Sequence, residues 1–283
     1  MLFRPRLVPT ATLLALLSVT ACRRPGPSLA DDHPGIDPKP AGQALSDKAP
    51  MTDPERKVID LSRPESISRS FDPSKSGDPT YDAALRGEAW AQTKVGKSYV
   101  ASTDDALRVQ QGVRLLQQAA EQNDAEALFV LGSLAMAGVG VTQSTTAAFD
   151  YCRRAAEFGL AEAQYELAAM YALGRGTEVD EEKALQWARR AMDQGNIKAK
   201  YSVGRMLLLA ENPTQLTEAV ELLNEATDSG IDEAGILLAE AYYSGNHGLT
   251  QDTSAAVEIL GKLSSRGNAK AGEIIERIKS AGE

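Results

Sequence analysis

The chain has 283 residues, 43% of them hydrophobic and 5% aromatic, and its 30 Lys and Arg residues stand against 39 Asp and Glu residues. The net charge of −9, with no cluster of basic residues, argues against a nucleic-acid-binding protein, because such proteins normally present a basic face. The two cysteines, Cys22 and Cys152, allow no disulfide within the region after Cys22, so an apolar core must stabilise the fold.

The N-terminus has the layout of a secretory signal peptide. Arg4 and Arg6 precede an apolar run over residues 7–19, and small residues connect this run to Cys22. As a helix at about 1.5 Å per residue, the run is roughly 20 Å long and falls short of a hydrocarbon core of ~30 Å. We therefore expect a signal peptide over residues 1–21 and no transmembrane helix there.

The end of this segment, VTAC at residues 19–22, resembles the lipobox of bacterial lipoproteins. The resemblance implies cleavage before Cys22 and a diacylglyceryl group on its thiol, which would anchor the mature chain to a membrane. Arg23 stands where enteric lipoproteins retained in the inner membrane carry aspartate, so the resemblance favours the outer membrane, on the periplasmic side or at the cell surface. The alternative is an ordinary signal peptide followed by a chance cysteine.

Residues 22–78 are predicted to form a disordered tether. Ten of the thirteen prolines lie between Arg23 and Pro79, among Asp, Ser, Lys and Gly residues. Such a composition buries too little apolar surface to offset the entropy lost on ordering. One short helix is predicted at residues 52–61, with Asp53 as its cap and Pro54 as its first residue.

From residue 79 to residue 283 the chain repeats itself with a period of about 36 residues. Small residues recur in register, and each is followed five residues later by another Gly or Ala. The last residue of each unit is Gly or Asn, at about the same spacing. The first of these columns is Ala91, Ala127, Ala163, Ala199 and Ala234. A column of larger apolar residues runs through Leu115, Tyr151, Trp187, Leu222 and Ile259.

Each unit is predicted to be a pair of helices, and residues 161–195 show it best. Apolar side chains fall at helical spacing from Ala163 to Tyr171, and Gly174 and Gly176 then end the first helix. Asp180 caps the second helix, which Gly195 ends. Trp187 is expected in the core between helices. A lone pair cannot bury its apolar face, so neighbouring pairs must stack.

The residues of this unit and its spacing resemble the Sel-one-like repeat family, which is related to the tetratricopeptide repeats. The resemblance implies an all-α, right-handed α/α superhelical solenoid of about five 36-residue helix-turn-helix repeats with half-repeat caps. Residues 81–87 match the end of a second helix, and residues 269–283 match a first helix without a partner. We therefore expect a half-repeat, five pairs and a closing helix.

The sequence shows no pattern typical of an enzyme, a metal site or a cofactor site. Its two histidines are His33 in the tether and His247 in a loop of the fifth repeat, and no Gly-x-Ser-x-Gly, phosphate-binding loop or zinc spacing occurs in the repeats. Cys152 belongs to an apolar column and is expected to be a buried, unreactive side chain. No catalytic residue, metal or cofactor is predicted.

Two functions remain open from these observations. The first is a lipid-anchored scaffold of the cell envelope that binds a protein or peptide on a concave surface, which the first helices line in arrays of this kind. The second is binding or hydrolysis of peptidoglycan or a related glycan through first-helix acids such as Glu162, Glu166 and Glu240. We favour the scaffold. Its predicted partner-binding residues are Lys94, Lys97, Phe129, Tyr165, Glu166, Tyr201 and Arg205. The three aromatic members could instead pack between repeats.

Overall fold

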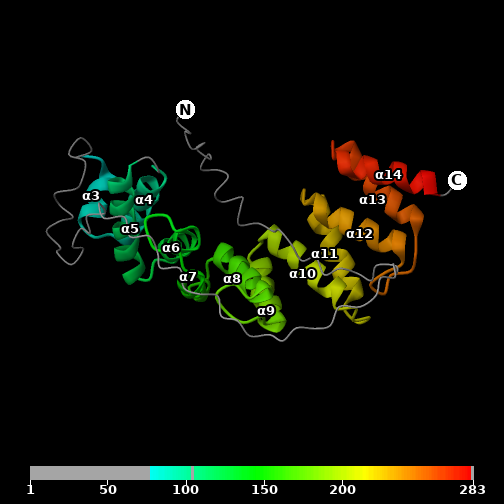
Figure 1. Cartoon of the computed structure of the whole chain (residues 1–283), viewed down its shortest axis with the longest axis horizontal. Coiled ribbons are helices and arrows are strands. Elements are labelled where there is room, and N and C mark those ends of the chain that lie inside the picture. The colour runs from blue at the N-terminus through cyan, green and yellow to red at the C-terminus, as the bar shows by residue number, and fades with distance from the viewer. Residues whose placement is uncertain (1–76, 103–104, 282–283) are drawn as a thin grey trace, which may run out of the picture. The chain divides into compact units, whose positions relative to one another are not determined.

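The computed structural model describes residues 77–102 and 105–281. Within these ranges the chain forms twelve α-helices and no strand, which follow one another in chain order in Figure 1. The helices are α3 (Pro79–Leu85), α4 (Ala89–Val100), α5 (Ala106–Glu121), α6 (Ala125–Ala137), α7 (Thr145–Glu157), α8 (Ala161–Leu173), α9 (Glu181–Asp193), α10 (Ile197–Leu209), α11 (Leu216–Asp228), α12 (Asp232–Ser244), α13 (Thr253–Ser265) and α14 (Ala269–Ala281).

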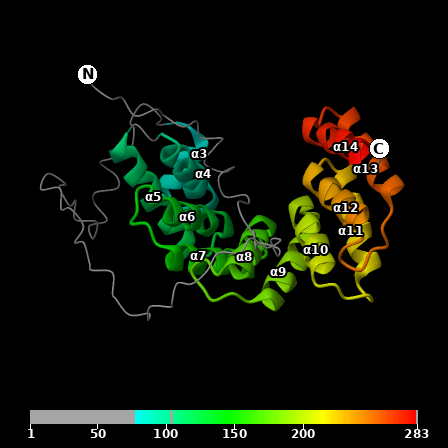
Figure 2. The same ribbon diagram turned by 45° about the vertical axis from the view of Figure 1, so that its right-hand side comes forward.

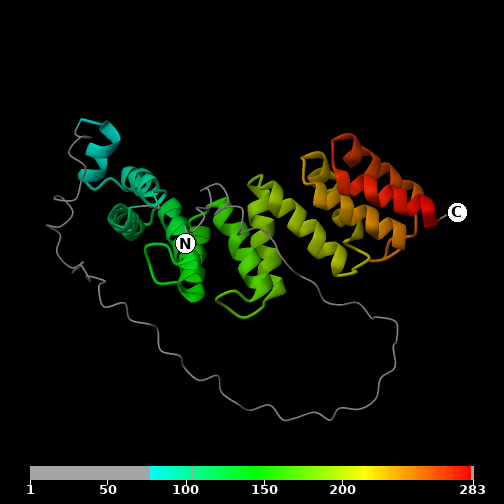
Figure 3. The same cartoon turned by 45° about the horizontal axis from the view of Figure 1, so that its top comes forward.

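The helices pack mainly against their neighbours in the chain. The most extensive contacts join α4 to α5, α6 to α7, α8 to α9, α10 to α11 and α12 to α13, so these are five helix pairs. Each second helix also contacts the first helix of the next pair, and Figures 2 and 3 show this order from two other directions. With α3 before the first pair and α14 after the last, the expected half-repeat, five pairs and closing helix are confirmed.

Small side chains allow the paired helices to approach closely. The alanine column from Ala91 to Ala234 is fully buried, and Ala271 of α14 continues it. Between α4 and α5, a Cβ added to Gly96 would lie 2.8 Å from Leu116 Cγ and 3.0 Å from the backbone oxygen of Gly112. A larger residue at either glycine would force the helices apart, which is the physical reason for small residues in this register.

The predicted helix ends are present. Asp180 accepts a hydrogen bond from the Lys183 backbone N–H at 2.9 Å and caps α9. Gly174 and Gly176 have φ values of +66° and +72° after α8. This left-handed conformation ends the helix, and it costs glycine little free energy because glycine has no side chain. Asn123 holds the same kind of conformation, with φ +66°, at the position where the later repeats have glycine.

In each second helix, the residue that follows the predicted column of large residues is buried. Leu116, Cys152, Ala188, Leu223 and Leu260 are all 3% exposed or less. Trp187, one residue before Ala188, is partly buried and packs against core residues on both sides of it along the array. The guanidinium of Arg190 lies over the Trp187 ring, 4.3 Å from its centre.

Several predictions fall on residues outside the described ranges. They are the signal peptide, the lipid acceptor Cys22, the tether up to residue 76 and the short helix at residues 52–61. Among residues 77–102 and 105–281, no helix combines the length and the apolar character needed to cross a membrane.

Candidate functional site

All seven predicted partner-binding residues lie on first helices, at two, three or six positions after the alanine column. We call the surface formed by these positions the first-helix face. The opposite side of the same helices is turned to the core, as Ala163, Leu167 and Met170 of α8 show by their complete burial. All seven predicted residues are partly buried or exposed, so this part of the face is accessible while the core side is not.

Tyr165 and Tyr201 occupy the same position on α8 and α10 and are both partly buried. Burial is the largest cause of the raised pKa of Tyr165, and the charge of Glu166 adds to it. A hydrogen bond with Ser202 and the charge of Arg205 act on the pKa of Tyr165 in the opposite direction. Ser202 and Arg205 both belong to α10, so Tyr165 bridges two consecutive first helices.

Tyr201 shares this environment. Its pKa is raised by burial, with Arg205 opposing the shift and Glu233 adding to it. Its ring packs against the apolar core of the repeats around α10 and α11. The two tyrosines therefore pack partly between repeats, as the alternative interpretation of the sequence allowed, and still leave part of each side chain accessible.

Glu166 is a partly buried carboxylate next to these tyrosines. Burial raises its pKa, and the charges of Arg175 and Lys198 oppose the shift. No hydrogen bond or ion pair joins its carboxylate to another residue within the described part of the chain. A desolvated acceptor of this kind gains free energy when a ligand supplies a donor.

The remaining predicted residues are not joined to this group. Lys97 of α4 forms an ion pair with Glu126, at the start of α6. Phe129 packs its ring against the core around α6 and α7. Lys94 is exposed. The structure thus brings Tyr165, Glu166, Tyr201 and Arg205 together on α8 and α10, and it gives Lys94, Lys97 and Phe129 separate surroundings.

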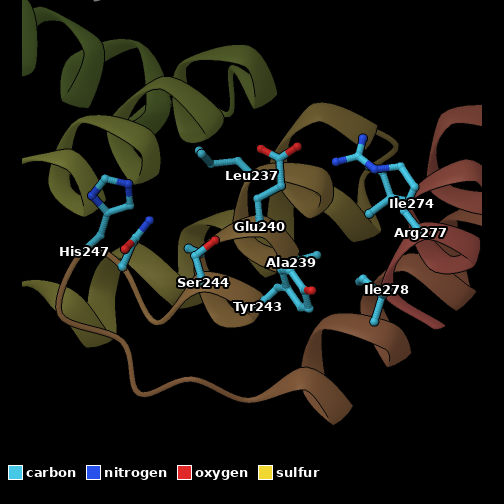
Figure 4. A pocket seen from close by; sticks show the side chains of 11 residues that line it. Leu237, Ala239, Glu240, Tyr243, Ser244, His247, Ile274, Arg277 and Ile278 are labelled. Carbon is cyan, nitrogen blue, oxygen red and sulfur yellow. The ribbon is translucent and has the colours of Figure 1, made fainter. Parts of the chain in front are cut away.

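A pocket that the sequence did not predict lies farther along the first-helix face, between α12 and α14. Its volume is about 510 Å³. Leu237 and Ile274 stand three positions after the alanine column on these helices, and Glu240 and Arg277 stand six positions after it (Figure 4). The repeat register could have located these four residues, because Glu166 and Arg205 hold the same positions on α8 and α10.

His247 lines the same pocket from the loop after α12. Its Nδ1 lies 3.2 Å from Oε1 of Glu211, which belongs to the corresponding loop after α10. This contact joins consecutive repeats at their loops. His247 was singled out in the sequence only as one of two histidines, and no pattern around it indicated a pocket.

The described residues offer no arrangement of three or more His, Cys, Asp or Glu side chains that could hold a metal ion. Cys152 is 3% exposed, and its Sγ donates a hydrogen bond to the Ala163 carbonyl oxygen at 3.3 Å. Burial raises the pKa of this thiol well above its ordinary value, and the charge of Glu166 raises it further. The predicted role of Cys152 as a buried apolar side chain agrees with this environment, because a nucleophilic cysteine needs an accessible thiolate.

Comparisons with known proteins agree with the repeat fold. The model of the Sel1 repeat matches the segments 91–124, 125–159, 161–196 and 233–268. A comparison with curated proteins finds no match.

Two solved structures are similar over most of the chain. A protective antigen of uropathogenic Escherichia coli with an SLR fold shares 24% identity at a TM-score of 0.64, over 77% of this chain and 48% of that one. A Sel1 repeat protein from Oxalobacter formigenes shares 25% identity at a TM-score of 0.55, over 77% of this chain and 62% of that one. This chain thus matches less than two thirds of either protein.

The four matched segments cover the pairs α4–α5, α6–α7, α8–α9 and α12–α13. The pair α10–α11 lies outside these segments but has the same helix lengths and the same packing as its neighbours. It lacks the Gly-x-Gly loop, and Glu211 adopts a positive φ of 52° after α10 instead. Four of the five helix pairs are thus matched as Sel1 repeats, and the chain belongs to the Sel1 repeat family.

Proposed function

We propose that this protein is a non-catalytic scaffold of the bacterial cell envelope that holds a protein or peptide partner on its first-helix face. The Sel1 repeat fold suggests a protein-interaction scaffold. The observation that carries the proposal for this chain is the group on α8 and α10, where two partly buried tyrosines, an arginine and a desolvated carboxylate share one accessible surface. Aromatic and Arg side chains are the usual energetic hot spots of protein interfaces.

The cellular address is part of the proposal and rests on the sequence alone. A diacylglyceryl group and a further acyl chain on Cys22 would hold the protein on the membrane, because two chains anchor durably where one is marginal. Residues 23–78 would then separate the repeats from the membrane surface. The outer membrane is the proposed location, because Arg23 stands where enteric lipoproteins retained in the inner membrane carry aspartate.

The proposal is tested by cross-linking in cells followed by mass spectrometry, and then by affinity measurements with the partner so found. Tyr201→Ala and Arg205→Ala should each weaken capture by about 1–2 kcal/mol, or roughly five- to thirtyfold, with an unchanged helical circular dichroism signal. Tyr165→Ala should do the same. Lys262→Ala on the second helix α13 is the matched control and should bind normally.

Two outcomes would contradict the scaffold. Tyrosine variants that melt early but bind normally once folded would show that the rings serve only to pack repeats together. Saturable binding of the purified protein to protein-free cell-wall sacculi, in the absence of any cross-linked protein, would favour the peptidoglycan-binding function instead.

A further inference from the structure

The pocket between α12 and α14 combines an apolar floor with two charged groups of opposite sign. Leu237, Ile274 and Ile278 supply apolar lining. Figure 4 shows the carboxylate of Glu240 and the guanidinium of Arg277 extending toward one another from α12 and α14. Its volume of about 510 Å³ falls in the range of ligand pockets, which is roughly 300–1,000 Å³.

Glu240 and Arg277 are both exposed, and neither forms an ion pair with any residue of the described part of the chain. Elsewhere between neighbouring helices such charges do meet, as Lys200 and Glu225 do at 2.7 Å between α10 and α11. At the pocket the two opposite charges are therefore available to a ligand that fits between them.

The opposite signs restrict the ligand. A polyanion such as a nucleic acid or an acidic membrane surface would be repelled by Glu240, and a polycation would be repelled by Arg277. A ligand that carries both signs close to an apolar group satisfies all three parts of the pocket. Peptide chains offer this combination within a few residues, and an extended chain places successive residues about 3.3 Å apart.

We propose that this pocket binds an extended peptide segment in which an apolar side chain is flanked, within two or three residues, by a basic residue on one side and an acidic residue on the other. The apolar side chain contacts Leu237, Ile274 and Ile278, while the basic group pairs with Glu240 and the acidic group with Arg277. The inference builds on the proposed function, since it assigns a ligand chemistry to a second part of the first-helix face.

The test is a fluorescence anisotropy titration with the purified full chain and three labelled, end-capped peptides. The first contains Lys-Ala-Leu-Ala-Glu, the second Lys-Ala-Leu-Ala-Lys and the third Glu-Ala-Leu-Ala-Glu. The mixed-charge peptide should bind several-fold more tightly than either like-charge peptide, because only it pairs with both Glu240 and Arg277. Glu240→Lys should weaken the mixed-charge peptide about tenfold and make the doubly acidic peptide the preferred ligand.

Two further variants distinguish binding in the pocket from a general effect of the charge of the protein. Lys270→Glu also reverses an exposed charge on α14, but Lys270 does not line the pocket, so this variant should leave the order of the three peptides unchanged. Ser244→Trp places a large ring at the exposed rim of the pocket and should abolish binding of the mixed-charge peptide without changing the helical signal.

Three results would each overturn the inference. They are equal affinities of the three peptides, absence of binding at millimolar protein, and a Glu240→Lys variant that keeps the original peptide preference. The Glu240 and Ser244 variants report on the pocket between α12 and α14, whereas the Tyr201 and Arg205 variants report on α10. Failure here with normal partner capture would therefore reject the pocket and retain the scaffold, and the reverse result would retain the pocket alone.

Discussion

Arg189 of α9 and Glu218 of α11 form a two-pronged ion pair between the second helices of consecutive repeats. The two nitrogen–oxygen distances are 2.5 Å for Nη1 to Oε1 and 3.0 Å for Nη2 to Oε2. A hydrogen-bonded pair of this geometry is stronger than an ordinary surface ion pair. It raises the pKa of Arg189 and lowers the pKa of Glu218 from its ordinary value of 4.5.

A double-mutant cycle with Arg189→Ala and Glu218→Ala should therefore give a coupling energy of about 0.5–1 kcal/mol at neutral pH, because both side chains are about a third exposed. Since the pKa of Glu218 is lowered in the folded state, this contribution is complete above its unfolded pKa and is lost as the pH falls through the lower folded pKa. Urea unfolding at pH 7 and at progressively acidic pH measures both effects. A coupling energy that is zero at pH 7, or that grows on acidification, would contradict the assignment.

Gly176 is predicted to be one of the least replaceable residues of the array. Its φ is +72°, and a Cβ there would overlap the backbone carbonyl of Thr145 and lie 3.0 Å from Phe149 Cβ. Gly176→Ala should lower the free energy of unfolding by about 3 kcal/mol or more, since conformational strain and steric overlap combine.

Gly195 is the matched control for this change. Its φ is +85°, but a Cβ added there would meet no atom within 4 Å. Gly195→Ala should therefore cost only the conformational term, about 1 kcal/mol. Chemical denaturation of both variants measures the difference, and equal losses would mean that the loop after α8 moves away from α7 at little cost.

Trp187→Ala should destabilise the array by about 2–3 kcal/mol, below the roughly 3–5 kcal/mol typical of a fully buried aromatic ring, because the indole is only partly buried. Trp90 is 54% exposed, and Trp90→Ala should cost well under 1 kcal/mol. In single-tryptophan variants, acrylamide should quench the fluorescence of Trp187 less than that of Trp90. Equal quenching would show that Trp187 does not pack between the repeats.

Cys22→Ser tests the proposed anchor. Since Cys22 precedes the repeats and the other cysteine, Cys152, is buried, Cys22 is the expected lipid acceptor. The variant should accumulate as uncleaved precursor or lose the mass of its acyl groups, and it should leave the membrane fraction after a high-salt wash. Mass spectrometry and fractionation measure these results. A wild-type mature chain without acyl groups that still resists the wash would contradict lipidation.

The sequence by itself determined the helix pairs and their boundaries. Small and large residues repeat about every 36 positions because each helix pair makes the same contacts. The loops between helices are only a few residues long, so consecutive helices must pack against each other. Turn residues such as Gly174, Gly176 and Asp180 act on the backbone near them, so their effect could be predicted without knowing the tertiary structure.

Only the tertiary structure decided which side chains of different repeats meet. Tyr165 reaches Ser202, and Glu240 and Arg277 line one pocket without forming an ion pair, because such contacts depend on the rotation and separation of helices that are a whole repeat apart. The rotation of α9 about its axis likewise decided that Ala188 is buried and that Trp187, one residue before it, is only partly buried. The sequence pattern repeats every 36 residues and predicts the same helix pair each time. Whether two side chains of different repeats touch or leave a pocket between them depends on shifts of less than about 1 Å, or rotations of a few degrees, in helix position, and the pattern does not specify these.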